Sequence, residues 1–172
     1  MLSPLQKERL RSAAQSAVTS ERATGVPAEL TVAQWVLESK WGAHAPGNNC
    51  FGIKAYRGCY GVQLLQTIEV VNGVRTPATE EFATFPTLQD CFAKHASLFT
   101  SAKPYATAWA QFQASHDMTA FVQQIAPVYA TDPSYGNMLL RIMAMPEVKS
   151  GVAEVRAAGS DPHPQNDVEV SE

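Results

Sequence analysis

The sequence predicts a mainly helical fold of the α+β class, in which one small β-hairpin lobe separates two sets of helices. Apolar residues recur at helical spacing before residue 42 and again after residue 87. Between these segments, residues 61–71 (GVQLLQTIEVV) are rich in apolar and β-branched side chains, and Asn72-Gly73 is a common two-residue hairpin turn. With 172 residues, 45% of them hydrophobic, the chain can bury one core.

The first two helices have recognisable ends. The first is expected to begin at Ser3, where Gln6 can complete a capping box, and to stop before Gly25. The second is expected to start around Pro27 and to end near residues 41–42, because the following HAPGNN segment cannot continue a helix. Apolar residues of this second helix fall at i, i+4, i+7 and i+11: Val26, Leu30, Ala33 and Leu37.

The hairpin is expected to return along residues 74–85, although Pro77 weakens the first half of that strand. Helices then resume at Thr87, which forms a second capping-box-like start with Asp90. Further helices are expected around 105–112, around 121–129 and, opened by Asp132-Pro133, through Met143.

After Pro146 the apolar period fades, so we expect one domain over residues 1–146 and a polar, acidic C-terminal tail over residues 147–172. The tail has six acidic and two basic residues, which leaves a charge of +1 on the rest of a chain whose net charge is −3. Such a near-neutral body lacks the clustered Lys and Arg of a nucleic-acid-binding protein. No apolar run approaches the roughly 20 residues that span a bilayer, so we expect no membrane span.

Cysteine and histidine spacing indicates neither a disulfide framework nor a metal site. The cysteines are Cys50, Cys59 and Cys91, and none forms a CxxC pair. We expect three free, partly buried thiols, with a single Cys50–Cys59 bridge as the alternative. The four histidines show no metal-ligand spacing, so we expect neither a metal nor a cofactor.

Glu38 is the first candidate for chemistry. It comes late on the second helix, and Gln34 and Trp41 lie on the same helical face. A carboxyl group beside apolar and aromatic side chains tends to have a raised pKa, which suits a general acid. Spacing alone, however, favours an ordinary helix-surface glutamate.

Glu69 is the second candidate, three residues before the Asn-Gly turn of the hairpin. Glycosidases commonly use two carboxyl groups on opposite sides of the scissile bond, and a helix facing a hairpin would supply them. Taken without Glu38, a solvated strand residue is the better interpretation. Glu80 and Glu81 compete for the role, but adjacent strand residues point to opposite faces, so at most one would face a cleft.

Other conspicuous residues favour structural interpretations. The glycines of PGNNCFGIK fit neither phosphate-loop spacing, and a tight turn that places Asn side chains against the backbone is better supported. The aromatic residues of the second half are individually interpreted as packing residues, and Tyr129 has a hydroxyl that could reach a cleft: Tyr105, Trp109, Tyr129 and Tyr135.

Four ordered segments resemble a known family. AQWVLESKWGAHAPGNNCFGIKA resembles the signature AQ-x-x-LES-x-WG…APGNN-x-FGIKA of the bacterial N-acetylglucosaminidases of glycoside hydrolase family 73. TIEVVNG is similar to that family's T-x-E-x-x-NG hairpin, FATFPTLQDCFAKHASLF to its FR-x-Y-x-S helix entry, and YATDPSYGNMLL to its YATDP-x-Y-x-x-KL segment. The resemblance covers about residues 24–145.

The resemblance implies a lysozyme-like fold, in which a helical body and a small β-lobe flank a cleft. It implies that Glu38 is the general acid, Glu69 the second carboxylate and Tyr129 a tyrosine that assists in the cleft. Further residues are expected to shape the cleft or bind substrate: Asn48, Asn49, Phe51, Trp41 and Tyr105. The chain departs from the family pattern at Trp35, Lys40, Cys50, Ala83, Phe85 and Met138, which could change the cleft shape.

On this basis we expect a monomeric peptidoglycan hydrolase that cleaves the β-1,4 bond after N-acetylglucosamine. A muramidase or lytic transglycosylase on the same fold is the alternative within enzymes, and a non-catalytic glycan-binding or assembly module is the alternative outside them. The N-terminus lacks the apolar core of a signal peptide. We therefore expect cytoplasmic synthesis and delivery to the cell wall by phage lysis or a dedicated secretion apparatus, with an immunity protein as a further possible partner.

Overall fold

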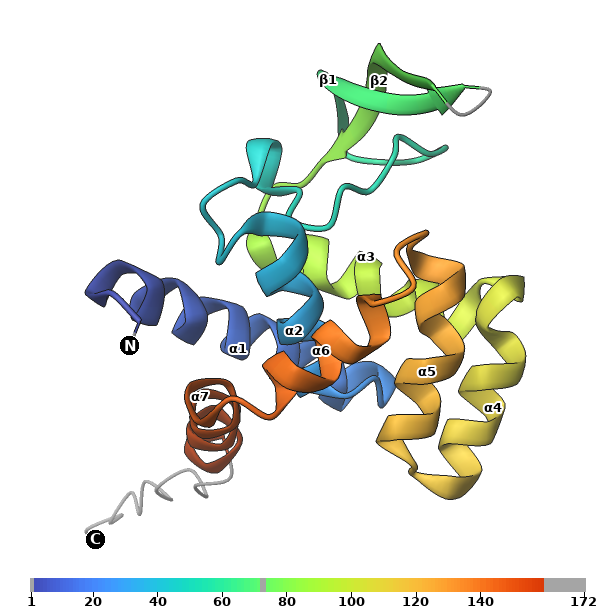
Figure 1. Cartoon of the computed structure of the whole chain (residues 1–172). Helices are drawn as coiled ribbons and strands as arrows, with labels where there is room; N and C mark the ends of the chain where they lie inside the picture. The colour runs from blue at the N-terminus through green and yellow to red at the C-terminus, as the bar shows by residue number, and fades with distance from the viewer. Residues whose placement is uncertain (1, 72–73, 160–172) are drawn as a thin grey trace, which may run out of the picture.

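A computed structural model describes residues 2–71 and 74–159, without the side chains of residues 69–71 and 75. The described chain forms a helical body with a two-stranded antiparallel hairpin that projects from one side of it (Figure 1). The predicted mainly helical fold with one hairpin lobe is therefore confirmed. The helices are α1 (Pro4–Thr24), α2 (Ala28–Ser39), α3 (Leu88–Ser101), α4 (Ala106–Ser115), α5 (Met118–Tyr129), α6 (Tyr135–Met143) and α7 (Pro146–Ala158); the strands are β1 (Gly61–Val71) and β2 (Val74–Thr84).

Both predicted capping boxes are present. The backbone N–H of Ser3 donates to Gln6 Oε1 at 2.9 Å, and Ser3 Oγ accepts from the Gln6 N–H. The Thr87 and Asp90 pair does the same at the start of α3. Gly25 ends α1 with a φ of 80°, a conformation that glycine adopts without steric cost.

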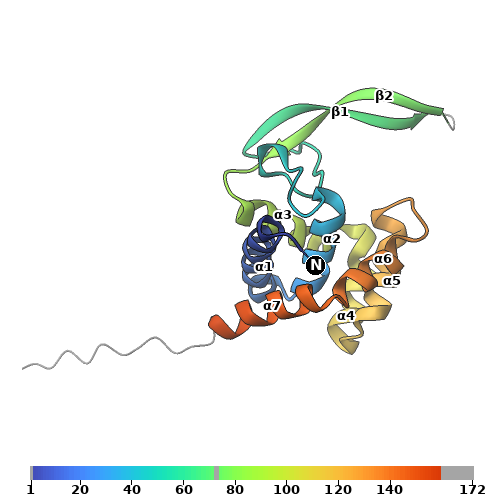
Figure 2. The same ribbon diagram turned by 60° about the vertical axis from the view of Figure 1, so that its left-hand side comes forward.

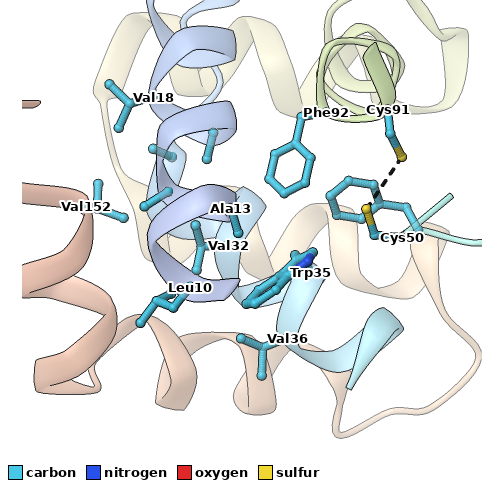
Figure 3. Close-up of a cluster of buried hydrophobic side chains, with 14 of the residues drawn as sticks. Leu10, Ala13, Val18, Val32, Trp35, Val36, Cys50, Cys91, Phe92 and Val152 are labelled. Carbon is cyan, nitrogen blue, oxygen red and sulfur yellow. Dashed lines mark hydrogen bonds between the residues drawn. The ribbon is translucent and has the colours of Figure 1, made fainter. Parts of the chain in front are cut away.

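Helix α2 is the central element of the body. Nine of its twelve residues are buried, because it packs against two separate groups of apolar side chains. Val32 and Trp35 contact the group beneath α1 and α7, which Figure 3 shows, whereas Leu30 and Ala33 contact the group formed by α3 to α6. The helix therefore has little freedom to shift relative to either half of the body.

The hairpin pairs β1 with β2 from Gly61↔Thr84 to Val71↔Val74, and the predicted Asn72-Gly73 turn lies outside the described residues. Strand β2 runs through Pro77 without interruption. At its base, residues 53–55 pair with the outer edge of β2 through two backbone hydrogen bonds of 2.9 Å. In Figures 1 and 2 the hairpin stands clear of the helices, with the segment between α2 and β1 beneath it.

The expected polar tail is wrong for its first twelve residues, because residues 147–158 belong to helix α7. Val148 and Val152 lie one turn apart and are fully buried against the body. Arg156 adds a second attachment, since its guanidinium donates to both carboxylate oxygens of Glu21 and to Glu29. The apolar stripe is short and flanked by charges, so its period is weak in the sequence. Residues 160–172 lie outside the described part.

The expected helix start at Asp132-Pro133 is also corrected. Asp132 Oδ1 accepts hydrogen bonds from the Ser134 N–H and hydroxyl at 2.8 and 2.7 Å, which forms a turn, and α6 begins only at Tyr135. All three cysteines are thiols. Among the described residues, no helix is long and apolar enough to cross a membrane.

Candidate active site

A cavity of about 440 Å³ lies where the end of α2 meets the base of the hairpin and helices α3 and α5. It brings together one acidic, two basic and several aromatic side chains. Its lining residues are Glu38, Phe51, Gly52, Ile53, Lys54, Lys94, His95, Leu98, Tyr105, Tyr129 and Ala130. A larger hollow of about 970 Å³ lies beside α4, α6 and α7, but its two carboxylates, Glu21 and Glu29, are ion-paired with Arg156. The smaller cavity is therefore the better candidate for acid chemistry.

Glu38 occupies the last turn of α2 and lines this cavity. The chain leaves the helix directly after Ser39, because Lys40 and Trp41 both adopt left-handed backbone conformations. Ser39 closes the turn: its hydroxyl donates to the Trp35 carbonyl and accepts from the Gly42 N–H. This sharp exit leaves the Glu38 side chain at the edge of the packed body.

A hydrogen-bonded chain holds the carboxyl group of Glu38. The hydroxyl of Tyr135, at the start of α6, donates to Glu38 Oε1 at 2.7 Å. The amide of Gln34, one helical turn before Glu38 and fully buried, donates weakly to the Tyr135 hydroxyl at 3.5 Å. Tyr135 thereby fixes one carboxylate oxygen and leaves Oε2 for other partners.

Burial raises the pKa of the Glu38 carboxyl group, and the hydrogen bond donated by Tyr135 lowers it by a smaller amount. The residue as a whole is nevertheless exposed. Water therefore still screens the charge, so the rise in pKa is partial. A carboxyl group with a raised pKa that a ligand can reach is suited to donate a proton.

Tyr129 lines the same cavity, and its ring stacks on that of Tyr135 with centroids 5.5 Å apart. Burial and the nearby Glu38 charge raise the pKa of both tyrosine hydroxyl groups above the ordinary value. Both phenols therefore stay protonated at neutral pH, and Tyr135 remains a hydrogen-bond donor to the carboxylate.

The other sequence-predicted residues divide into two groups. Phe51 and Tyr105 line the cavity. Trp41 does not, because it packs edge-on against Trp35 with ring centroids 6.2 Å apart. Asn48 and Asn49 are also outside it: their amides donate to backbone carbonyls of the β2–α3 connection and neighbouring segments, which fixes the turn that carries Phe51.

Glu69 lies in β1, where its backbone is paired with Thr76. It is six residues beyond Gln63, whose amide donates to the Pro46 carbonyl at the base of the hairpin. At the usual rise of a strand this corresponds to about 20 Å along β1. The side chain of Glu69 lies outside the described part, so its role as the partner of Glu38 stays a prediction.

Sequence reasoning missed His95 as a cavity residue and interpreted Tyr135 only as a packing residue. His95 lies on the apolar stripe of α3, which is the pattern of a core position, and it stacks on Phe51 with centroids 3.8 Å apart. Burial lowers the pKa of its imidazole to about 3. Within the described residues neither ring nitrogen has a hydrogen-bond partner. Tyr135 is the second tyrosine of the YATDP-x-Y segment, which is a signal for the residue, but no spacing in the chain connects it to Glu38, which lies 97 residues away.

Two lysines line the side of the cavity nearest the hairpin. Lys54 forms an ion pair of 3.1 Å with Glu80 on β2, and its ammonium group lies 4.5 Å from the centre of the Phe82 ring. Lys94, on α3, places its ammonium group 4.0 Å from the centre of the Tyr56 ring. In the described part of the chain, no three His, Cys, Asp or Glu side chains gather as a metal site.

Comparisons with known proteins agree with this architecture. The family model described as mannosyl-glycoprotein endo-beta-N-acetylglucosaminidase matches residues 14–147. The chain is 34% identical over 146 residues to a probable N-acetylmuramidase of Lactococcus lactis subsp. cremoris (strain MG1363), covering 78% of this chain and 32% of that protein. It is 32% identical over 129 residues to the peptidoglycan hydrolase FlgJ of Vibrio parahaemolyticus, covering 70% of this chain and 41% of that protein.

Among solved structures, a mutant of a peptidoglycan hydrolase from Sphingomonas sp. A1 superposes with a TM-score of 0.70 at 27% identity, covering 86% of this chain and 99% of that one. The chain thus spans about a third to two fifths of the curated relatives but almost the whole of this structure. The match to the family model over most of the chain, together with these relatives, shows that the chain belongs to the glucosaminidase family, glycoside hydrolase family 73.

Proposed function

We propose that the chain hydrolyses peptidoglycan at the β-1,4 bond that follows N-acetylglucosamine, with Glu38 as the general acid. The observation that carries the proposal is the Glu38 carboxyl group, which lies in an aromatic-lined cavity and is held by Tyr135. Membership of a glycosidase family and the peptidoglycan hydrolases among its relatives support the substrate class. The site of action is accordingly the cell wall.

The hydrogen bond from Tyr135 suggests how Glu38 acts. Because Tyr135 donates to Oε1, the acidic proton of Glu38 resides on Oε2 and is transferred to the glycosidic oxygen of the leaving group. The carboxylate formed in this step is then stabilised by the same donor. Burial raises the pKa of this carboxyl group, which favours the protonated form that donates the proton.

Glu69 is our proposal for the second carboxylate, on the evidence of its family motif and its place on the hairpin. In this role Glu69 activates water on the opposite face of the sugar. Nucleophilic attack by the carboxylate and assistance from the substrate's N-acetyl group are the alternatives. In a substrate complex, a carboxyl separation of roughly 5–5.5 Å favours retention and about 6.5–9.5 Å favours inversion.

One specific alternative exists for the bond that is cleaved. The family description is an endo-β-N-acetylglucosaminidase, whereas the Lactococcus relative is called a probable N-acetylmuramidase. These enzymes cut neighbouring bonds of the same strand and leave different reducing ends, so the products distinguish them.

The test is mass spectrometry of muropeptides released from purified cell walls. Reducing-end N-acetylglucosamine is expected, and reducing or anhydro N-acetylmuramic acid would overturn the proposed bond. Glu38→Gln and Glu69→Gln are each expected to lower the rate by roughly 100-fold or more, since each removes an acid–base group. Glu81→Gln is the matched control, because Glu81 is exposed on β2, and it should retain the wild-type rate.

For each variant, a different result would contradict the proposed role of the substituted residue. Wild-type activity in Glu38→Gln removes Glu38 from its role, and wild-type activity in Glu69→Gln removes only the second carboxylate. If the folded wild-type chain binds cell walls but releases no product from any of them, the non-catalytic glycan-binding alternative replaces the enzyme.

A further inference from the structure

Two cysteines that are distant in the sequence meet next to residues that line the cavity. Cys50 lies in the turn before Phe51, and Cys91 lies in the first turns of α3. Their sulfur atoms are 3.8 Å apart (Figure 3), although 41 positions separate the residues. The exposed fractions are 1% for Cys50 and 0% for Cys91, and the neighbouring Phe92 is also fully buried.

Each cysteine adjoins a residue that lines the cavity. Cys50 directly precedes Phe51, and Cys91 is one helical turn before His95. The rings of Phe51 and His95 stack on one another with centroids 3.8 Å apart. A covalent bond between the two sulfur atoms would therefore tie the turn that carries Phe51 to helix α3, which carries His95.

The two thiols differ in acidity because of the hydrogen bond between them. The Cys50 thiol donates to the Cys91 sulfur, which lowers the pKa of Cys91 and, together with burial, raises the pKa of Cys50. Cys91 is consequently the member that more readily forms a thiolate, and the thiolate is the nucleophile that reacts with oxidants.

We propose that Cys50 and Cys91 form a buried oxidisable pair that hydrogen peroxide converts into a disulfide, fixing the Phe51 turn to α3. The Cys91 thiolate attacks one peroxide oxygen, the O–O bond breaks, and sulfenic acid and hydroxide form. The Cys50 thiol then attacks the sulfenic sulfur, its proton leaves with the sulfenic oxygen as water, and the S–S bond forms. In total, one peroxide is reduced to two waters while two thiols are oxidised.

Because the pair is buried, only a small oxidant can reach its sulfur atoms. A bulky disulfide reagent cannot reach sulfur atoms with 0–1% exposure, whereas peroxide is about as small as two water molecules. Cys59 is half-buried rather than buried, so it provides an internal comparison. Bulky thiol reagents should label Cys59 in the folded protein and leave Cys50 and Cys91 unlabelled.

The experiment uses Cys59→Ser, which keeps the pair and removes the third thiol. Treatment of the folded protein with hydrogen peroxide should lower the intact mass by about 2 Da, since two hydrogens are lost. Under denaturing conditions no thiol should then react with a label, and peptide mapping should join the Cys50 and Cys91 peptides. A cross-link over this loop length should raise the thermal midpoint by about 10 °C, and dithiothreitol should reverse every change.

The matched control is Cys59→Ser combined with Cys91→Ala, which leaves only Cys50. It should lose no mass on oxidation and gain no thermal stability. If the folded Cys59→Ser protein keeps two reactive thiols, gains oxygen without losing hydrogen, or links between chains, the proposed pair is overturned. This test measures mass and thermal stability, so its outcome is independent of the proposed glycosidase activity.

Discussion

The helical body and the hairpin that projects from it are built in opposite ways. The body carries Glu38 on α2, a helix with nine of its twelve residues buried, and adds a hydrogen bond from the distant Tyr135. The hairpin is a two-stranded sheet with large apolar side chains exposed: Leu64 is 66% exposed and Ile68 is 53% exposed. Contacts between the hairpin and the body are concentrated at its base, at residues 53–55 and at the Lys54–Glu80 ion pair.

This difference shows where the fold supplies rigidity. A catalytic group is held most accurately when packing and hydrogen bonds lock its conformation, and Glu38 has both. A two-stranded hairpin is only marginally stable without a third element. If Glu69 is the second carboxylate, its approach to the sugar therefore depends on how the hairpin is held at its base.

The first prediction, with the largest expected effect, compares how much the helical body and the hairpin each contribute to stability. Leu30→Ala on α2 should lower the free energy of unfolding by about 2–5 kcal/mol, because it leaves a cavity in a fully buried cluster. Leu64→Ala on β1 removes the same atoms from an exposed face and should change it by less than about 0.5 kcal/mol. Denaturant unfolding of both variants makes the comparison. Equal losses would show that the outer face of the hairpin is covered in solution, and the contrast would fail.

The second prediction concerns the hydrogen bond to Glu38. Tyr135→Phe should lower kcat by roughly 10- to 100-fold, because it removes a donor to a developing carboxylate worth about 1.5–3 kcal/mol. The Tyr135 bond lowers the pKa of Glu38, so its loss should raise that pKa. The decline of activity on the alkaline side should accordingly move to higher pH in a pH–rate profile.

Tyr60→Phe is the control for this variant, because Tyr60 is exposed and its hydroxyl donates to Asp90 Oδ1 at 3.4 Å, away from Glu38. Its pH profile should coincide with that of the wild type. A Tyr135→Phe profile with reduced kcat but an unmoved alkaline limb would mean that Tyr135 positions the helices and does not act on the Glu38 carboxyl group.

The third and smallest effect is a pH dependence of stability from His95. Its pKa is about 3 in the folded protein and about 6.5 when unfolded, so the unfolded state binds more protons between these values. Stability should therefore fall as the pH is lowered, by about 2 kcal/mol between pH 7 and pH 5 from this group alone. His95→Phe should remove that part of the loss in denaturant unfolding at the two pH values.

The exposed His44 provides the matched comparison, since His44→Gln should keep the full loss of stability in acid. If His95→Phe loses as much stability as the wild type between pH 7 and pH 5, the burial of a neutral imidazole is not the cause. This prediction tests the helical body, because the His95 ring is enclosed by the aromatic residues Phe51, Phe99 and Tyr129.

The sequence alone predicts most of the local structure. The capping boxes at Ser3 and Thr87, the stop at Gly25 and the two strands all depend on neighbouring residues, so short-range patterns suffice to find them. Glu38 could also be identified as the candidate acid from the sequence, because the family motif around it is continuous in the chain. Helix α7 was missed because only Val148 and Val152 supply its fully buried stripe.

Only the tertiary structure decided what surrounds the candidate groups. It brought Tyr135 to Glu38 across 97 positions, placed His95 against Phe51 beside the cavity, and set Cys50 against Cys91 across 41 positions. Helical and strand periods arise from hydrogen bonds between near neighbours along the chain. The environment that tunes the pKa of Glu38 arises instead from the packing of α2, α5 and α6, whose relative positions no local pattern encodes.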